Sequence, residues 1–280
     1  MKLRFTKMQG TGNDFMVIDA IRQTVPELTA DQVRRLADRH FGVGFDQLLL
    51  AERALVPGTD FNYRIFNADG TEVQMCGNGA RCFARFVLER GLTDRERLRV
   101  STARGVIELM MHQDQSVTVN MGPPVFEPRL IPLRSEVQRT LYGLDLEDGG
   151  YIEFGAVSMG NPHAVLNCRV LSDEYVATVA PLVQASPAFP EGVNVGFMQI
   201  RSPEEISLRV FERGCGETLA CGSGACAAVV CGVEQHLLSS LVTVHLPGGE
   251  LRIIYAGGGS DVLLTGPAHS VYDGEVELHE

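Results

Sequence analysis

The stretch "MCGNGARC" at residues 75–82 returns in nearly the same form as "ACGSGACA" at residues 220–227. Each copy places a cysteine before a Gly-polar-Gly sequence, and the two cysteines, Cys76 and Cys221, stand 145 positions apart (221 minus 76). Self-similarity at a fixed offset is typical of a duplicated architecture. The repeat therefore predicts two similar lobes, each with a cysteine at the same place in its fold.

Other matches follow in the same order and at nearly the same offset. They are Gly12-Asn13 with Gly160-Asn161 (offset 148), Gln47 with Asn194 (147), Asn67 with Glu212 (145), and "VTVNMGP" at 117–123 with "VLLTGP" at 262–267 (144). The Gly-Pro pairs that close the two halves are turn signals at which a regular strand ends. We expect an N-terminal lobe of residues 1–121 plus 267–280 and a C-terminal lobe of residues 122–266.

Local patterns predict both strands and helices. Short β-branched runs with partial alternation, such as "RLRVST", "EISLRVF" and "LVTVHL", are typical of strands. Apolar residues recur at helical spacing after Cys76, with Gly91 placed to end that helix, and the segment after Cys221 is apolar on every side. The predicted fold is α+β, with two pseudo-symmetric lobes from an internal duplication. Each lobe would be a curved, mostly antiparallel sheet around a central helix, with the active site in the cleft between the lobes.

Composition limits the kinds of partner and the compartment. The chain has 280 residues, 45% of them hydrophobic, a formal net charge of -11 and a pI near 5.1. An acidic chain without basic runs is a poor binder of nucleic acid or of anionic membranes. No segment has the roughly 20 apolar residues that a membrane helix needs, and no signal peptide is recognisable. We expect a cytoplasmic protein with small-molecule partners.

The cysteine count argues against a disulfide framework and against zinc. Seven cysteines is an odd number, in a chain too large to need disulfides for stability. The pairs Cys76/Cys82 and Cys221/Cys226 have five and four residues between them, unlike the CxxC spacing of zinc ligands. The sequence predicts free thiols and no metal.

A thiol at the start of a helix has a particular chemistry. The unpaired amides and partial positive charge of a helix N-terminus favour a thiolate and can hold an anion. Glycines let a ligand approach the backbone closely. Those of the motif are Gly77 and Gly79 in one half and Gly222 and Gly224 in the other. Asn78 and Ser223 stand between them, where a short polar side chain can cap the helix or contact a ligand.

Two such thiols on opposite sides of one substrate suit an epimerase or racemase without a cofactor. One thiolate removes a proton from one face of a carbon, and the other thiol returns a proton to the opposite face. The alternative for each cysteine alone is a buried small hydrophobe, because free cysteines are commonly internal. The repetition of the motif favours the catalytic interpretation. Packing is the interpretation for Cys82, Cys168, Cys226 and Cys231, while the role of Cys215 stays open.

Several motifs together carry a family resemblance. The sequences "GTGNDF", "GFDQLLL", "FNADG", "MCGNGARC", "GNPH", "VNV", "ERGCGETLACGSGA" and "VYDG" run in order from about residue 10 to residue 274. In this set the chain resembles the diaminopimelate epimerases. Proline and hydroxyproline racemases are similar in fold and also pair two thiols, but they are associated with a histidine where this chain has Asn78.

The resemblance implies interconversion of LL- and meso-diaminopimelate without pyridoxal phosphate or metal. It implies acid-base roles for Cys76 and Cys221 and supporting catalytic roles for His163 and Glu212. The other residues that it places around the substrate are Asn13, Gln47, Asn67, Gly77, Asn78, Asn161, Asn194, Arg213, Gly222 and Ser223. Ser223 replaces the threonine more often associated with the motif and keeps the hydroxyl. Tyr272 matches a position that the family uses at a dimer contact, which implies a homodimer.

The residue types agree with this division, although each residue alone has a simpler explanation. Arg213 offers a bidentate fork for a carboxylate, and asparagine amides suit a zwitterionic head group. Without the resemblance, the asparagines could be turn residues, Gln47 a strand-edge residue, His163 structural and Glu212-Arg213 a surface ion pair. Tyr272 could pack on its own lobe.

Three functions besides this epimerisation stay open on the sequence. One is a two-thiol racemase or epimerase of another amino acid, such as proline or hydroxyproline. Another is a non-catalytic binder of carboxylate metabolites, whose binding would survive replacement of both cysteines. The last is a redox sensor, because thiols of low pKa oxidise readily.

Overall fold

The computed structural model describes residues 1–145 and 150–278 and divides into two compact units. The N-terminal lobe consists of Met1–Asn120 and Thr265–Glu280, and the C-terminal lobe of Met121–Leu264. The boundaries thus fall at 120/121 and 264/265, where the sequence predicted 121/122 and 266/267.

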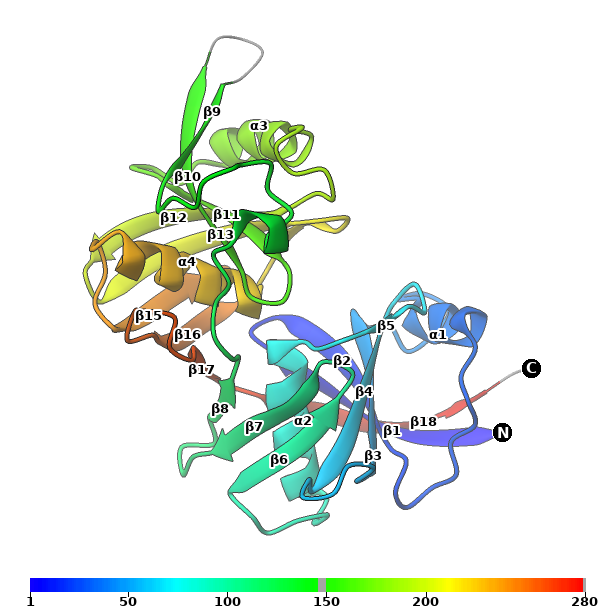
Figure 1. Cartoon of the computed structure of the whole chain (residues 1–280). Coiled ribbons are helices and arrows are strands. Elements are labelled where there is room, and N and C mark those ends of the chain that lie inside the picture. The colour runs from blue at the N-terminus through cyan, green and yellow to red at the C-terminus, as the bar shows by residue number, and fades with distance from the viewer. Residues whose placement is uncertain (146–149, 279–280) are drawn as a thin grey trace. The chain divides into compact units, whose positions relative to one another are not determined.

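Within the described residues, the N-terminal lobe has two helices and a set of paired strands (Figure 1). Its helices are α1 (Ala30–Ala37) and α2 (Gly77–Glu89). Its strands are β1 (Lys2–Gly10), β2 (Asn13–Asp19), β3 (Gln47–Arg53), β4 (Phe61–Asn67), β5 (Glu72–Val73), β6 (Arg97–Thr102), β7 (Gly105–Met111), β8 (Val117–Asn120) and β18 (His269–Glu277). The last of these pairs antiparallel with β1, so the C-terminal end of the chain completes the first lobe.

The C-terminal lobe repeats this plan. Its helices are α3 (Asp173–Gln184), α4 (Gly222–Glu234) and the 3-10 turn η1 (Pro128–Leu130). Its strands are β9 (Tyr142–Asp145), β10 (Tyr151–Ser158), β11 (Pro162–Asn167), β12 (Asn194–Ser202), β13 (Glu205–Glu212), β14 (Gly216–Thr218), β15 (Leu241–Leu246) and β16 (Gly249–Ile254). A further strand, β17 (Leu263–Gly266), spans the second boundary between the units.

Strand pairing confirms the duplication. In the first lobe β1–β2, β3–β4 and β6–β7 are antiparallel, while β2–β3 and β4–β6 are parallel. In the second lobe the corresponding pairs β10–β11, β12–β13 and β15–β16 are antiparallel, and β11–β12 and β13–β15 are parallel. The same alternation of directions in both lobes is the expected result of one ancestral unit copied once.

Each sheet surrounds one helix, as the sequence predicted. Helix α2 contacts β1, β2, β3, β7 and β8, and α4 contacts β10, β11, β12, β13 and β16. Because each helix touches strands from both ends of its sheet, the sheet must curve around it. Both helices have 13 residues. Gly91 follows the end of α2 with φ +59, the left-handed conformation in which glycine ends a helix at little cost.

The two central helices differ in the side chains that they bury. In α4 the buried residues are glycine, alanine, valine and cysteine, so this helix is apolar on all sides and enclosed. Helix α2 also buries glycine, alanine, valine and cysteine, together with Phe83, Phe86 and the polar residues Asn78 and Arg81. The other face of each sheet is covered by α1 or α3, each of which begins at a side-chain cap, Thr29 or Ser172.

Candidate active site

Cys76 stands at the N-cap of α2 in an extended conformation, with φ -135 and ψ 122. It is half-buried, and its Sγ lies 3.8 Å from Oδ1 of Asn13, which begins β2. The following Gly77, Asn78 and Gly79 form the buried first turn of the helix. The strand-to-helix transition therefore presents the thiol at the end of the helix where the backbone amides are unpaired.

The neighbouring amides are held in a defined order. The Asn13 Nδ2 group donates to Asp46 Oδ2 at 2.8 Å, which turns Asn13 Oδ1 toward the thiol. Nδ2 of Asn78 donates to the same Oδ1 at 3.4 Å. The structure thus brings Asn13, Cys76 and Asn78 together.

Gln47 and Asn67 meet across the β3–β4 pair, where they are register partners. Gln47 Nε2 donates to Asn67 Oδ1 at 2.9 Å. The Gln47 Oε1 atom is buried and has no hydrogen-bond partner among the residues that the structure describes. A buried, unpaired carbonyl oxygen is energetically costly, and an ammonium or amide donor on a ligand would satisfy it.

Cys221 occupies the same N-cap position at the start of α4, with φ -119 and ψ 109. It is 5% exposed, and its Sγ donates to Glu212 Oε2 at 3.2 Å. Ser223 Oγ lies 3.5 Å from the same sulfur. Burial and the adjacent Glu212 carboxylate raise the pKa of the Cys221 thiol well above its usual value. Both effects favour the protonated thiol, which donates to that carboxylate.

Glu212 is itself oriented by a residue that the sequence analysis did not single out. The Thr218 hydroxyl donates to Glu212 Oε1 at 2.6 Å, which leaves Oε2 for the Cys221 thiol. Thr218 pairs with Val210 in the short hairpin formed by β13 and β14. No counterpart in the repeat marks it, because the matching position in the first half is Val73.

His163 lies in β11 directly beside Asn194 of β12. It is 1% exposed, and its Nε2 lies 3.0 Å from Asn161 Oδ1. Burial, and secondarily the charge of Arg213, lowers the pKa of His163 to about 3. The imidazole is therefore neutral at physiological pH and acts as a hydrogen-bonding group without charge.

Arg213 joins the same cluster through its backbone. Its N–H donates to Asn194 Oδ1 at 2.8 Å, and its exposed side chain donates from Nη1 to the carbonyl of Glu191 at 2.7 Å. The predicted residues of the C-terminal lobe therefore fall into one group, which is Asn161, His163, Asn194, Glu212, Arg213, Cys221, Gly222 and Ser223. The first lobe gathers Asn13, Gln47, Asn67, Cys76, Gly77 and Asn78.

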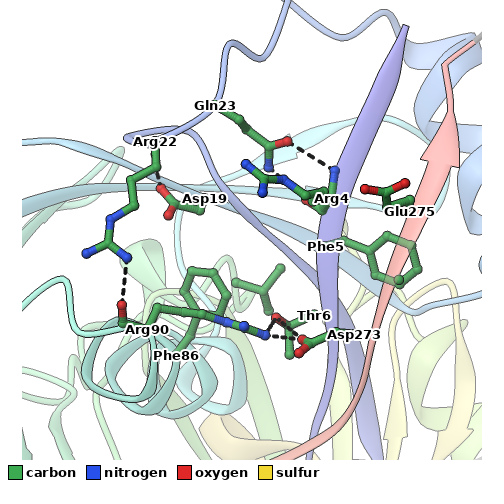
Figure 2. Close-up of a pocket in the computed structure, with 12 residues that line it drawn as sticks. Arg4, Phe5, Thr6, Asp19, Arg22, Gln23, Phe86, Arg90, Asp273 and Glu275 are labelled. Atoms are coloured by element: carbon green, nitrogen blue, oxygen red, sulfur yellow. Dashed lines mark hydrogen bonds and ion pairs between the residues drawn. The ribbon is translucent and has the colours of Figure 1, made fainter.

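A cavity of about 470 Å³ lies elsewhere in the N-terminal lobe, between β1, β18 and the end of α2 (Figure 2). Most of its charged groups are paired within the lobe. Arg90 donates to Asp273, and Arg22 donates to the carbonyls of Arg90 and Gly91, which end α2. None of the predicted substrate residues lines it. Phe5, in its wall, packs edge-on against Tyr272 with ring centroids 6.0 Å apart.

Among residues 1–145 and 150–278, no group of three or more His, Cys, Asp or Glu side chains is placed to hold a metal ion. Within the same residues, no helix has the length and apolar character needed to cross a membrane.

Comparison with known proteins identifies the family of the chain. The sequence pattern of the family described as "Diaminopimelate epimerase" matches residues 5–127 and 155–271. The chain belongs to the diaminopimelate epimerase family. It is 57% identical over 280 residues to a diaminopimelate epimerase of Thioalkalivibrio sulfidiphilus, covering 99% of this chain and 100% of the relative. A second relative with this name, from Chromobacterium violaceum, is 55% identical over 278 residues, with the same coverage.

Solved structures extend the likeness of fold beyond this family. A probable proline racemase from Agrobacterium radiobacter superposes with a TM-score of 0.71 at 16% identity, covering 99% of this chain and 93% of that chain. A hydroxyproline epimerase from Agrobacterium vitis gives 0.70 at 14% identity, covering 98% and 92%. At these identities the likeness concerns the fold alone, and it agrees with the predicted α+β duplication.

Proposed function

We propose that the chain epimerises LL-diaminopimelate to meso-diaminopimelate without a cofactor, using Cys76 and Cys221 as an acid-base pair. The observation that carries the proposal is the repeated placement of a cysteine at the N-cap of each central helix. This arrangement occurs in a chain whose relatives of 55–57% identity are named diaminopimelate epimerases. Two lobes that each supply one thiol provide the two acid-base groups that inversion at a carbon requires.

The reaction balances with these groups alone. A thiolate takes the α-proton from one face of the substrate, so that the Cα–H bond breaks and its electron pair stays on the carbon and the adjacent carboxylate. The thiol of the other cysteine then gives its proton to the opposite face. The helix-terminal amides at Gly77 and Gly222 stabilise the negative charge that develops on the carboxylate. The cysteines exchange roles when the reaction runs backward.

Glu212 supports the proposed role of Cys221 because it already accepts the hydrogen bond of that thiol. A carboxylate can take the proton outright, whereas the amide oxygen of Asn13 beside Cys76 cannot. His163 stays neutral, so it contributes a hydrogen bond near the reacting centre and not a charge. Ser223 and Asn78 contact the substrate carboxylate from the first turns of the two helices.

The distal amino acid group of the substrate would bind to amides and to one guanidinium. Gln47, with its unpaired buried Oε1, would accept a hydrogen bond from a substrate ammonium. Asn67, Asn161 and Asn194 supply uncharged donors and acceptors for the zwitterion. Arg213 would pair with the distal carboxylate after leaving the Glu191 carbonyl.

We also propose that the chain acts as a homodimer through the surface around Tyr272. This residue is 48% exposed and its neighbour Val271 is 58% exposed. Both lie on β18, the strand whose Asp273 lines the cavity of Figure 2. A Tyr272→Ala variant should lower the mass measured by analytical ultracentrifugation from dimer to monomer. A variant that is still a dimer would place the contact elsewhere. A wild type that is already a monomer would refute the homodimer. A cytoplasmic location remains a prediction.

The test of the proposed function is epimerisation by reduced protein stripped of metals and cofactors. We expect LL-diaminopimelate to be converted to the meso isomer, and Cys76→Ser and Cys221→Ser each to slow conversion by at least about 1,000-fold. Cys168→Ser is the matched control, because this thiol is buried in the core of the C-terminal lobe. Conversion of proline or hydroxyproline instead would favour the racemase alternative. Binding that survives loss of both thiols, without turnover, would favour a metabolite binder.

A further inference from the structure

Arg81 is the residue outside the predicted site whose contacts point most directly to it. Its side chain is 0% exposed and lies on the second turn of α2, one turn after Cys76 and Asn78. Three of its hydrogen bonds reach different segments of the N-terminal lobe. They run from Nη1 to Asn78 Oδ1 at 2.9 Å, from Nη2 to Thr11 Oγ1 at 3.0 Å and from Nε to the Pro267 carbonyl at 3.1 Å.

A guanidinium in this place is unfavourable for the helix by itself. Removing a charge from water is costly, and a cation near a helix N-terminus opposes the helix dipole. The repeat shows that the fold does not need one, because Arg81 corresponds to Cys226 at the offset of 145. Cys226 is also 0% exposed, yet α4 has the same 13 residues as α2. A requirement other than the helix therefore accounts for Arg81.

The partners of Arg81 belong to the segments that hold the Cys76 thiol in place. Thr11 lies in the turn between β1 and β2 with φ +55, a conformation that is unfavourable for a β-branched residue. Two positions later that turn delivers Asn13, which contacts the thiol. The turn is packed closely on Arg81, since a Cβ added at Gly10 would lie 3.2 Å from Arg81 Nη2. The guanidinium thus fastens the turn to the start of α2.

Arg81 also decides the orientation of the asparagine amides. A guanidinium only donates hydrogen bonds, so Asn78 must turn Oδ1 toward Arg81 and its NH₂ toward Asn13. At the other end the Asp46 carboxylate accepts from Asn13 Nδ2. Between these two charged residues, Asn13 Oδ1 is directed at the Cys76 sulfur.

We infer that Arg81 is a positioning residue for the Cys76 half-site: it fixes the amides of Asn78 and Asn13 and the turn that carries Asn13. The expected effect on the epimerisation rate rests on the proposed function. The expected effect on the reactivity of the Cys76 thiol does not. Without Arg81, Asn78 can flip its amide, the turn at Thr11 loses its anchor, and the thiol loses its fixed acceptor.

The experiment compares Arg81→Met and Arg81→Lys with the wild type in two assays. The first is epimerisation, where we expect Arg81→Met to be slower by on the order of 100-fold, as for a displaced acid-base group. The second is the pH profile of Cys76 alkylation by iodoacetamide, read by mass spectrometry without substrate. Loss of the acceptor that holds the protonated thiol should move its midpoint to lower pH. Arg81→Lys should recover part of the alkylation shift. Tyr63 and Cys82, which also interact with Cys76, are unchanged in every variant.

Arg85→Met is the matched control, since Arg85 lies one turn further along α2 and pairs with Glu89 and Gln115. It should leave both assays unchanged. If Arg81→Met does not fold, Thr11→Val decides the question, because it removes one acceptor of Arg81 and keeps the β-branched shape. Thr11→Val should slow epimerisation about 10-fold, and Thr11→Ser should restore it.

A folded Arg81→Met with wild-type alkylation and wild-type rate would overturn the inference. If Arg81→Met does not fold, a Thr11→Val variant with wild-type epimerisation would overturn it as well. A wild-type protein that alkylates at Cys76 but does not epimerise diaminopimelate would refute the proposed function alone, and the alkylation shift would still test Arg81.

Discussion

Replacing His163 with glutamine should flatten the dependence of stability on pH. In the folded protein, burial and Arg213 lower the pKa of His163 to about 3, against an ordinary value of 6.5 that the unfolded chain regains. The unfolded state therefore binds a proton below pH 6.5 that the folded state does not bind until about pH 3. The stabilisation that results is complete above pH 6.5 and is lost as the pH falls through this window.

The magnitude follows from the two pKa values. One pKa unit corresponds to about 1.4 kcal/mol, so acidification from pH 7 to pH 5 should remove about 2 kcal/mol of unfolding free energy through this histidine. His163→Gln removes the titrating group and keeps a polar NH₂ within reach of Asn161. Its stability should therefore fall by about 2 kcal/mol less than that of the wild type over the same range.

The assay is urea unfolding at pH 5, 6 and 7, with His40→Gln as the control because His40 is exposed. A direct check is NMR titration of the His163 imidazole, whose resonance should not move between pH 7.5 and pH 5. A titration midpoint near pH 6, or an identical pH dependence in the variant and the wild type, would refute the reasoning. A midpoint near pH 6 would also mean that His163 can carry a positive charge in the site.

Two further predictions concern the N-terminal lobe. A Cβ at Gly79 would lie 2.6 Å from Tyr63 Oη, so Gly79→Ala should destabilise the protein by about 2 kcal/mol in thermal unfolding. The loss should be smaller in a Tyr63→Phe background, and equal losses in both backgrounds would contradict the contact. Despite the opposing effect of burial, hydrogen bonds from Arg39 and Lys7 hold the pKa of Asp14 well below its usual range. Asp14→Asn should cost about 3 kcal/mol at pH 7, because it leaves the largely buried Lys7 without its carboxylate. This deficit should shrink as the pH falls below about 4, because the unfolded wild type then binds a proton at Asp14 that the folded protein does not bind, which lowers the stability of the wild type. A deficit independent of pH would count against the ion pair.

Much of the fold could be predicted because the same motif and strand pattern occur twice in one chain. The strand at Arg97–Thr102, the strand at Leu241–Leu246 and the helix ending before Gly91 follow from local alternation and turn residues. Parallel pairing of β2 with β3 and of β4 with β6 could not be predicted, because it depends on which strands meet after a crossover.

The candidate site divides in the same way. Cys76 and Cys221 were predicted because the motif repeats, and the structure gives both the same N-cap position. Arg81, Asp46 and Thr218 were missed because each acts through a neighbour, and contacts of that kind depend on tertiary structure. Arg81 did leave one signal, which is a charged residue in one copy of the motif against a cysteine in the other.

The central claim is that two thiols act on one carbon from opposite faces, and isotope labelling of the first product tests it most directly. Unlabelled LL-diaminopimelate is mixed with reduced protein in heavy water, and the meso product and remaining substrate are analysed at less than one-tenth conversion. With two bases, the proton delivered comes from the second thiol, which has exchanged with solvent. We therefore predict meso product that carries deuterium at the inverted carbon, beside substrate that is still almost unlabelled. Product that retains the substrate's own proton would indicate a single base that serves both faces, and would contradict the account.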